Sequence, residues 1–512
     1  MSLATPHDVK VKALLVNPPN HFRDTDDLAP PLGLLCLAAA LSGEGISVEL
    51  LDLNLRSCTV GYETSISFYE SAVAMILNTD PDIIGFTSMA INSHVALQLA
   101  AATKRHCPEI FTIFGGPHFG ALGDRLIEAF DFVDAVVTGE GENAAREIAR
   151  DLQTHERPSR RTWRASSRMS QGHPWTAYPL IDLNRYYSAN PRRVLNGEAG
   201  RGCKYHCRFC YSPTLWNGAV ELSPDIVAAD FAEATARGAE HLFVVGDNYL
   251  NDPNVARTIC RALEGLSQRP TWNCYGTLPD LRPDIIEHLS RAGCRSIYLG
   301  IDAVTEQQRT SYGKSFVKSL DRCCETIQLL VDAGVTPTCS FILDPLRLDA
   351  EELEENLRWA AHLRARGAEL SFHVLTPYTG TALKERRTPG DAVTDSFRIS
   401  LRFDCPPAVI ENPLVGGRED LFPFHVGRAK MREPFRFGVS VIHAAQCILT
   451  HFPDEIADLL RDGRVSFSSL VMQAAEAAVP TDCDCVDPLI AKEAVLVATE
   501  NILCQEYGFA LS

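Results

Sequence analysis

Residues 200–210 read GRGCKYHCRFC, and this stretch determines how the rest of the chain is interpreted. Its three cysteines, Cys203, Cys207 and Cys210, form a C-x3-C-x2-C pattern. Thiolates are the preferred ligands of iron–sulfur clusters, and three on one short loop can converge on one site. The pattern predicts a [4Fe–4S] cluster whose fourth iron is left open. The alternatives are three packed thiols or a zinc site, for which His206 is the nearest fourth ligand.

Strand candidates alternate with helical stretches after this loop. The first one ends just before it, and the six lie at residues 193–198, 241–245, 272–275, 296–301, 337–343 and 369–375. Six strand–helix units predict an open (β/α)6 barrel over residues 192–385, with reactive groups at the carboxyl ends of its strands. Residues 386–512 lack this rhythm and are predicted to be mainly helical, with helices at 456–460, 468–478 and 489–502.

The N-terminal part repeats the same alternation. Strands are expected at residues 13–16, 48–53, 83–87, 111–114 and 134–137, with a helix at 34–41 after the first of them. Strands that alternate with helices predict a doubly wound, parallel α/β sheet, here over residues 1–150. The apolar period is lost in residues 151–191, which are predicted to be a linker.

Composition narrows the functional classes. A chain of 512 residues is long enough for about three domains. The net charge of -17 disfavours nucleic acid as a partner. No apolar run is long enough to span a membrane, and the cysteines are scattered through apolar segments, so we expect a cytoplasmic protein. Cys483, Cys485 and Cys504 are unevenly spaced, so inert thiols are expected there rather than a second cluster.

The cysteine motif, with aromatic Phe209 before its last cysteine and a barrel-like chain after it, resembles the radical S-adenosylmethionine (SAM) superfamily. This resemblance implies that SAM chelates the open iron and that an electron from the reduced cluster cleaves SAM to a 5′-deoxyadenosyl radical. It also implies an electron donor of the flavodoxin or ferredoxin type.

The same resemblance suggests residues that contact SAM. In the superfamily, SAM is gripped from the ends of the second, fourth and fifth barrel strands. The matching residues are Asp247 and Asn248, Asp302, and Ser340, together with Phe209 of the loop. Asp247 or Asn248 would accept a hydrogen bond from the SAM ammonium. The alternative is an ordinary strand-to-helix turn with an N-cap. A turn at residues 376–381 resembles the one that closes the barrel in the cobalamin-carrying class.

Loops at the strand ends of the N-terminal sheet resemble the cobalamin-binding domain of class B radical SAM enzymes. The expected cobalamin contacts are Pro31, Thr87, Ser88, Gly115, Gly116, Gly139 and Glu140. Glycines would let the backbone approach the cobalamin tail, and the two hydroxyls would bind it. The Asp-x-His-x-x-Gly signature is absent, so no protein imidazole is expected on cobalt, and a loop residue such as His118 is more often solvated or structural. A sheet that binds no corrin is the alternative.

Together these features predict a cobalamin-dependent radical SAM C-methyltransferase. Its substrate would be a small-molecule or peptide natural-product intermediate methylated at an unactivated carbon, with no nucleic acid or membrane involved. The alternatives are a cyclase or rearrangement enzyme with the same cofactors, and a non-catalytic iron–sulfur binding or sensor protein.

Overall fold

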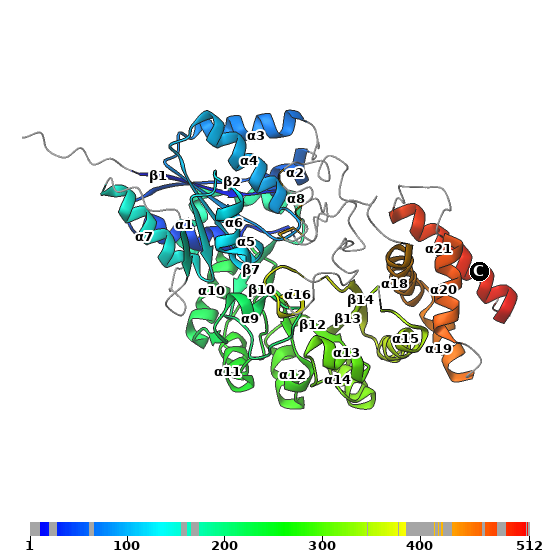
Figure 1. The fold of residues 1–512 in the computed structure, drawn as a ribbon. Coiled ribbons are helices and arrows are strands. Elements are labelled where there is room, and N and C mark those ends of the chain that lie inside the picture. Colours follow the sequence, from blue (N-terminus) through cyan, green and yellow to red (C-terminus); the bar gives the residue numbers. More distant parts are fainter. Residues whose placement is uncertain are drawn as a thin grey trace, which may run out of the picture. The chain divides into compact units, whose positions relative to one another are not determined.

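The computed structural model separates the chain into two compact units (Figure 1). One comprises residues 1–196 and 411–422, and the other residues 197–410 and 423–512. The structure describes residues 11–19, 28–60, 66–154, 161–164, 174–345, 347–376, 378–385, 414, 418, 421–422, 433–462, 466–478, 488–507 and 509. Cys483 and Cys485 lie outside these residues.

The N-terminal unit is built on a six-stranded parallel sheet in the order β2-β1-β3-β4-β5-β6. Its strands are β1 (Lys12–Asn17), β2 (Ser47–Asp52), β3 (Ile83–Thr87), β4 (Phe111–Gly115), β5 (Ala135–Thr138) and β6 (Arg161–Arg164). Its helices are α1 (Leu32–Ser42), α2 (Leu53–Val60), α3 (Ile66–Asn78), α4 (Ser93–His106), α5 (Gly116–Leu122), α6 (Asp124–Ala129), α7 (Gly141–Gln153), η1 (Pro174–Leu180) and α8 (Leu183–Ala189). The doubly wound α/β fold is confirmed.

The segment 151–191 differs from the expected linker. Strand β6 adds a sixth strand to the sheet, and its Trp163 is buried in a small core with Phe111 and Ile148. Helices η1 and α8 follow, and η1 packs on α1. Only one residue of the four in β6 is buried, so the strand carries no readable period in the sequence.

The second unit holds a parallel sheet in the order β14-β13-β12-β11-β10-β7, which is the predicted strand order of the barrel. Its strands are β7 (Val194–Glu198), β10 (His241–Val245), β11 (Thr271–Gly276), β12 (Cys294–Asp302), β13 (Thr336–Leu343) and β14 (Glu369–Val374). A short antiparallel pair joins β8 (Gly200–Arg201) to β9 (Val220–Glu221). The helices are α9 (Ser212–Leu215), α10 (Pro224–Ala236), α11 (Pro253–Glu264), η2 (Leu278–Asp280), α12 (Pro283–Arg291), α13 (Glu306–Tyr312), α14 (Leu320–Asp332), α15 (Ala350–Arg364) and α16 (Ala382–Glu385).

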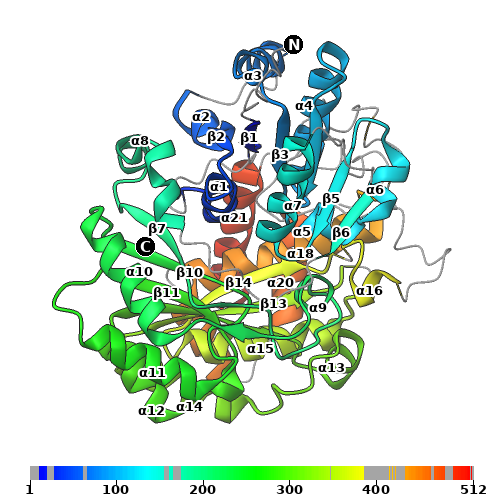
Figure 2. The ribbon, with the colours of Figure 1, turned by 90° about the vertical axis from the view of Figure 1, so that its left-hand side faces the viewer.

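Alternate residues of the barrel strands face opposite sides of this sheet. Helices α11, α12 and α14 cover one side of it (Figures 1 and 2). Trp272, Cys274, Ile297 and Leu299 are fully buried. The residues between them, such as Tyr275 and Tyr298, lie on the inner face and are partly exposed.

The C-terminal helices are α18 (Glu433–His451), α19 (Pro453–Asp462), α20 (Phe467–Ala478) and α21 (Pro488–Tyr507). Helix α18 packs on the barrel's last strand, β14, whereas α19 and α20 pack on α15. Gln446 of α18 accepts from the backbone N–H of Phe372 at 2.8 Å and donates to the carbonyl of Leu370 at 3.1 Å. One side-chain amide thus completes the exposed edge of β14, as a neighbouring strand would. Among the helices that the structure describes, none has the length and apolar character needed to cross a membrane.

Candidate cofactor sites

The cysteine loop begins in a conformation that requires glycine. Gly202 has a φ of +79°, and a Cβ atom there would lie 2.0 Å from the carbonyl oxygen of Gly218. No other residue fits this approach of two backbone segments. The chain therefore turns sharply from the end of the first barrel strand into the three cysteines.

Two residues at the end of β10 hold the start of this loop. The Asp247 carboxylate accepts the backbone N–H of Gly202 at 2.8 Å. Asn251 donates to the carbonyl of Gly202 at 2.8 Å and accepts the N–H of Lys204 at 2.9 Å. Asp247, which the sequence suggested as a SAM contact, is therefore already bound to the loop backbone, while Asn251 was not singled out from the sequence.

The far half of the loop is tied to α13 and α16. The backbone N–H of Arg208 donates to Tyr312 at 2.8 Å, and its carbonyl accepts the N–H of Leu383 at 2.7 Å. The Arg208 guanidinium also donates to the carbonyl of Thr310 at 2.8 Å. Phe209 packs edge-on against the ring of Tyr312. These contacts fix the loop where the last two cysteines branch from it.

The three thiols fit an iron–sulfur cluster. Two of them accept backbone N–H groups, from Tyr205 to Cys203 at 3.5 Å and from Ser212 to Cys210 at 3.4 Å. Such bonds stabilise cluster sulfurs. Burial raises the pKa of the Cys207 thiol to about 11 and that of Cys210 to about 12, and it also raises the pKa of Cys203. Binding iron would therefore release protons from all three.

The zinc alternative can be compared with this geometry. Within the described part of the chain, no group of three or more Cys, His, Asp or Glu side chains is arranged to hold a single metal ion. A [4Fe–4S] cluster spreads its cysteines over three different irons and does not need such convergence. The loop therefore suits a cluster better than one ion.

Asp302 and Ser340, two of the predicted SAM contacts, lie together and form a buried set with Lys314. The Asp302 carboxylate pairs with the Lys314 ammonium at 2.5 Å and accepts the hydroxyl of Ser340 at 2.5 Å. Asp302 has a φ of +58°, which is uncommon for a residue with a side chain. Lys314 was missed because a lysine outside a motif gives no signal in the sequence. The set also lies beside Cys207, whose pKa both charges affect.

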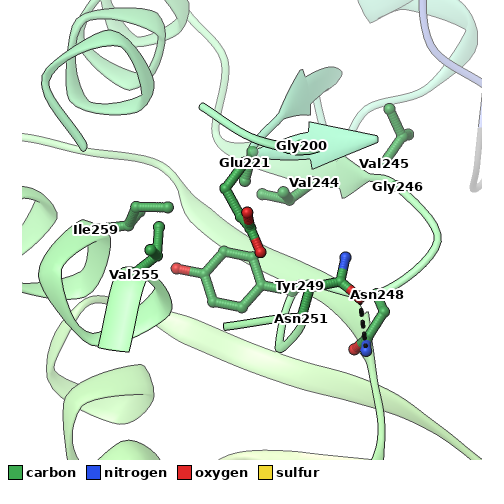
Figure 3. A pocket seen from close by; sticks show the side chains of 11 residues that line it. Gly200, Glu221, Val244, Val245, Gly246, Asn248, Tyr249, Asn251, Val255 and Ile259 are labelled. Atoms are coloured by element: carbon green, nitrogen blue, oxygen red, sulfur yellow. Dashed lines mark hydrogen bonds between the residues drawn. The ribbon is translucent and has the colours of Figure 1, made fainter. Parts of the chain in front are cut away.

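Asn248 lies in the turn after β10, beside the first cysteine of the loop. Its side chain accepts the N–H of Leu250 at 3.1 Å and donates to Asn251 at 3.3 Å, the contact drawn in Figure 3. A hydrogen bond from the Asn248 side chain also lowers the pKa of the Cys203 thiol, against the larger effect of burial. The cavity in Figure 3, also lined by Glu221 and Tyr249, measures about 10 Å³, which suits about one water molecule and is far too small for SAM. Asn248 therefore serves the turn and also contacts the proposed cluster site.

The inner face of the barrel carries a row of aromatic side chains. Phe243, Tyr275 and Tyr298 lie on three neighbouring strands, with ring centroids 5.3 and 5.4 Å apart. The Tyr298 hydroxyl lies 2.6 Å from Nε2 of His373, which is also 2.9 Å from the hydroxyl of Ser371. Burial holds the pKa of Tyr298 well above its usual value, so the phenol stays neutral.

In the N-terminal unit, the loops after β3 and β4 meet at the carboxyl edge of the sheet. The strand order reverses beside them, between β1 and β3, and such sheets bind ligands at this switch point. Gly116 has a φ of +87°, and a Cβ atom there would lie 2.7 Å from the carbonyl oxygen of Ser88 and 2.9 Å from Oγ1 of Thr87. The Ser88 N–H donates to the carbonyl of Gly115 at 3.2 Å. Thr87, Ser88, Gly115 and Gly116 are thus brought together.

Ser88 provides a test of whether cobalamin fits this edge. Its side chain is 2% exposed, and its hydroxyl oxygen has no hydrogen-bond partner among the described residues. A buried hydroxyl without a partner is unfavourable unless a ligand supplies one. Together with the close approach at Gly116, this hydroxyl fits a ligand with polar groups, as the cobalamin tail has.

The other predicted cobalamin residues lie at neighbouring strand ends. Gly139, with a φ of +84°, and buried Glu140 follow β5, and Pro31 precedes α1. His118 lies in α5 rather than in a loop and is buried between the rings of Phe119 and Phe422. Burial lowers the pKa of His118 to about 3, so of the two roles expected for this residue, solvated or structural, the structural one fits.

Known protein families match both the N-terminal part of the chain and the barrel. Residues 24–149 match the B12 binding domain family, and residues 198–360 match the radical SAM superfamily. An uncharacterized methyltransferase of Pyrococcus horikoshii is 24% identical over 73% of this chain and 83% of its own length. An anaerobic magnesium-protoporphyrin IX monomethyl ester cyclase of Cereibacter sphaeroides is 20% identical over 70% of this chain and 61% of its own length.

A solved structure shows the same arrangement of elements. The cobalamin-dependent SAM radical enzyme OxsB, with aqua-cobalamin and SAM bound, superimposes with a TM-score of 0.64 at 13% identity. The match covers 99% of this chain and 82% of that one, and at this identity it establishes the fold. Two family matches in this order, over two sheets of the expected topology, show that the chain carries a B12-binding domain followed by a radical SAM domain. This is the domain pair of the cobalamin-dependent radical SAM enzymes, whose cofactors are a [4Fe–4S] cluster, SAM and cobalamin.

Proposed function

We propose that this enzyme transfers a methyl group from SAM to an unactivated carbon of a small-molecule or peptide natural-product intermediate. The observation that carries the proposal is the similarity to an uncharacterized methyltransferase over 73% of this chain, beside the matches to the B12 binding domain and the radical SAM superfamily. When bound, the cluster supplies the electron that cleaves SAM and the cobalamin supplies a methyl carrier. An electron donor of the flavodoxin or ferredoxin type would reduce the cluster.

The chain's own residues would bind and orient the cluster, SAM and cobalamin, and these cofactors would supply the reactive groups. Cys203, Cys207 and Cys210 would ligate three irons, and Phe209 would pack beside the cluster. The buried pair of Lys314 and Asp302 would give the barrel's fourth strand end a fixed polar surface for SAM, with Ser340 beside it. Thr87, Ser88, Gly115 and Gly116 would receive cobalamin, with Pro31, Gly139 and Glu140 around it. Domain limits at residues 150, 191 and 385 remain part of this proposal.

The side chains on the inner face of the barrel favour a substrate that combines a ring or another flat apolar group with a polar edge. Phe243, Tyr275 and Tyr298 offer aromatic surface, and aromatic rings stack or meet edge to face. Tyr298 and His373 offer a hydrogen-bonding pair at the end of this row. Neutral Tyr298 would donate or accept one hydrogen bond, which would orient the substrate carbon without adding charge.

A second candidate is ring formation rather than methyl transfer. It is favoured by the similarity to a cyclase over 70% of the chain. Both reactions would consume SAM at the same cluster, so the fate of the SAM methyl group separates them. A third candidate, a non-catalytic sensor, would cleave no SAM at all.

The test uses the protein purified without oxygen and supplied with iron, sulfide and hydroxocobalamin. SAM labelled with three deuterons on its methyl group is added with a reductant and a metabolite extract from the expression host. The proposal predicts 5′-deoxyadenosine, S-adenosylhomocysteine and a product that carries the three deuterons. A deuterium-free product with 5′-deoxyadenosine would favour the cyclase, and an intact cluster that cleaves no SAM would favour the sensor.

A further inference from the structure

The first half of the cysteine loop is bound to one carboxylate from the neighbouring strand end. Asp280 closes η2, the turn after β11. Its Oδ1 pairs with the ammonium of Lys204 at 2.7 Å, and its Oδ2 accepts the hydroxyl of Tyr205 at 2.9 Å. Two consecutive residues of the loop, directly after the first cysteine, are therefore bound to the same side chain.

The Asp280 carboxylate is also held by contacts within its own turn, independently of the cysteine loop. Thr277, in the same turn, donates its hydroxyl to Oδ2 of Asp280 at 2.5 Å, and the Asp280 N–H donates to the carbonyl of Thr277 at 3.1 Å. Only 12% of the Asp280 side chain is exposed. The turn therefore presents the carboxylate in one orientation, and the loop has to fit it.

Lys204 is held from several directions. Besides Asp280, its ammonium donates to the carbonyl of Asn251 at 3.0 Å and to that of Leu250 at 3.3 Å. Its three N–H groups thus have three acceptors, from the ends of two different strands. Charge-assisted bonds of this kind are shorter and stronger than neutral ones, so they restrict the loop more than its few backbone contacts would.

Tyr205 also connects the loop to the segment that follows a third strand, β12. Its ring packs on Phe316 with centroids 4.2 Å apart, and the ammonium of Lys314 lies 5.2 Å from the centre of the Phe316 ring. Asp280 thus anchors a residue that also touches the segment after β12, where Asp302 and Lys314 form their buried pair. The position of the loop is in this way set relative to the proposed SAM surface.

We propose that Asp280 is a positioning residue for the iron–sulfur cluster: by fixing Lys204 and Tyr205, it keeps the cysteine loop in the one conformation in which the open iron meets SAM. It ligates nothing itself. A misplacement of about 1 Å at a reacting centre costs on the order of a hundredfold in rate, so a loop free to shift would still hold iron and yet cleave SAM slowly. This inference rests on the cluster assignment and not on methyl transfer.

The experiment compares Asp280→Asn, Lys204→Met and their double variant in the holoenzyme loaded with cluster and cobalamin. The matched control is Asp284→Asn, which removes the same charge from the start of α12. Asp284 is 46% exposed, and its ion pairs with the described residues are to Arg257 at 3.2 Å and Arg282 at 3.5 Å. Iron content, the electron paramagnetic resonance (EPR) spectrum of the reduced cluster with and without SAM, and amide exchange of residues 202–206 are measured.

Asp280→Asn should keep its iron, lose most of the spectral change on adding SAM, and exchange the loop amides about tenfold faster. The double variant should lose less than the sum of the two single losses, because both single variants remove the Asp280–Lys204 contact. Asp284→Asn should match the wild type. A wild-type EPR response and wild-type loop exchange in Asp280→Asn would overturn this inference alone. A wild type with no EPR signal would instead remove the cluster assignment on which both proposals rest.

Discussion

The cysteine loop and the loops proposed to receive cobalamin both lie at the carboxyl ends of parallel strands. They are held in place by different kinds of contact. Charged side chains, Asp280 and Lys204 among them, fasten the cysteine loop. The loops after β3 and β4 are held by backbone contacts and by the missing side chain of Gly116. A cluster bound through three points needs a rigid support, whereas a large corrin needs space and polar groups without partners. The comparison shows that the carboxyl ends of parallel strands can carry a site held by charged side chains or a site held by backbone contacts.

The largest effect is expected from removing a cluster ligand. Cys207→Ala should reduce iron from about four to less than one per chain and abolish 5′-deoxyadenosine formation, because two thiolates do not retain the cluster. Cobalamin content should stay unchanged, since the substitution lies in the other unit. Exposed Cys504 provides the control, and Cys504→Ala should keep its iron. Iron at the wild-type level in Cys207→Ala would contradict the loop as the cluster site.

The converse experiment acts on the cobalamin edge. Gly116→Ala should weaken cobalamin binding by at least about tenfold while iron content is kept, because its Cβ atom would collide with the backbone of Ser88. Gly45 has a similar φ of +76° with open space around it. Gly45→Ala therefore shares the backbone strain without the collision, and it should bind cobalamin normally. Equal loss in both variants would mean that strain alone, and not close approach, explains the effect.

A smaller effect is expected from the hydroxyl of Ser88. Ser88→Ala removes a buried polar group that lacks a partner in the described residues, so the protein without cobalamin should be no less stable. If cobalamin supplies the partner, its affinity should fall about threefold to tenfold. Equilibrium dialysis measures the affinity and urea unfolding measures the stability. Unchanged affinity would remove Ser88 from the site.

The smallest effect concerns stability away from both sites. Burial and then the carboxylates of Asp349 and Asp344 raise the pKa of Glu352 to about 7. A folded-state pKa above the unfolded one favours folding at low pH, and this contribution is lost as the pH rises through about 7. Glu352→Gln should therefore match the wild type at pH 5 and gain on the order of 2 kcal/mol at pH 8.5. Urea midpoints at the two pH values check this, and an unchanged pH dependence would refute it.

Periodicity in the sequence predicted the strands of both sheets except β6, whose four residues bury only Trp163. The cysteine motif was equally readable because its ligands lie within eight residues of one another. Asp280 and Lys314 were not predictable in this way. Each acts on residues from a different strand end, and such contacts depend on register and on side-chain direction, which one sequence does not display. Asn248 matched a motif, but the sequence did not show that its side chain also bonds within its own turn, as asparagines often do.

The iron–sulfur cluster and cobalamin are expected to bind at separately built sites of one chain. Iron and cobalamin per chain should therefore be measured in the same anaerobic preparation of the wild type, Cys207→Ala and Gly116→Ala. We expect about four irons and one cobalamin for the wild type, cobalamin alone for Cys207→Ala, and iron alone or nearly so for Gly116→Ala. Loss of both cofactors together in either variant, with the fold intact, would contradict this expectation.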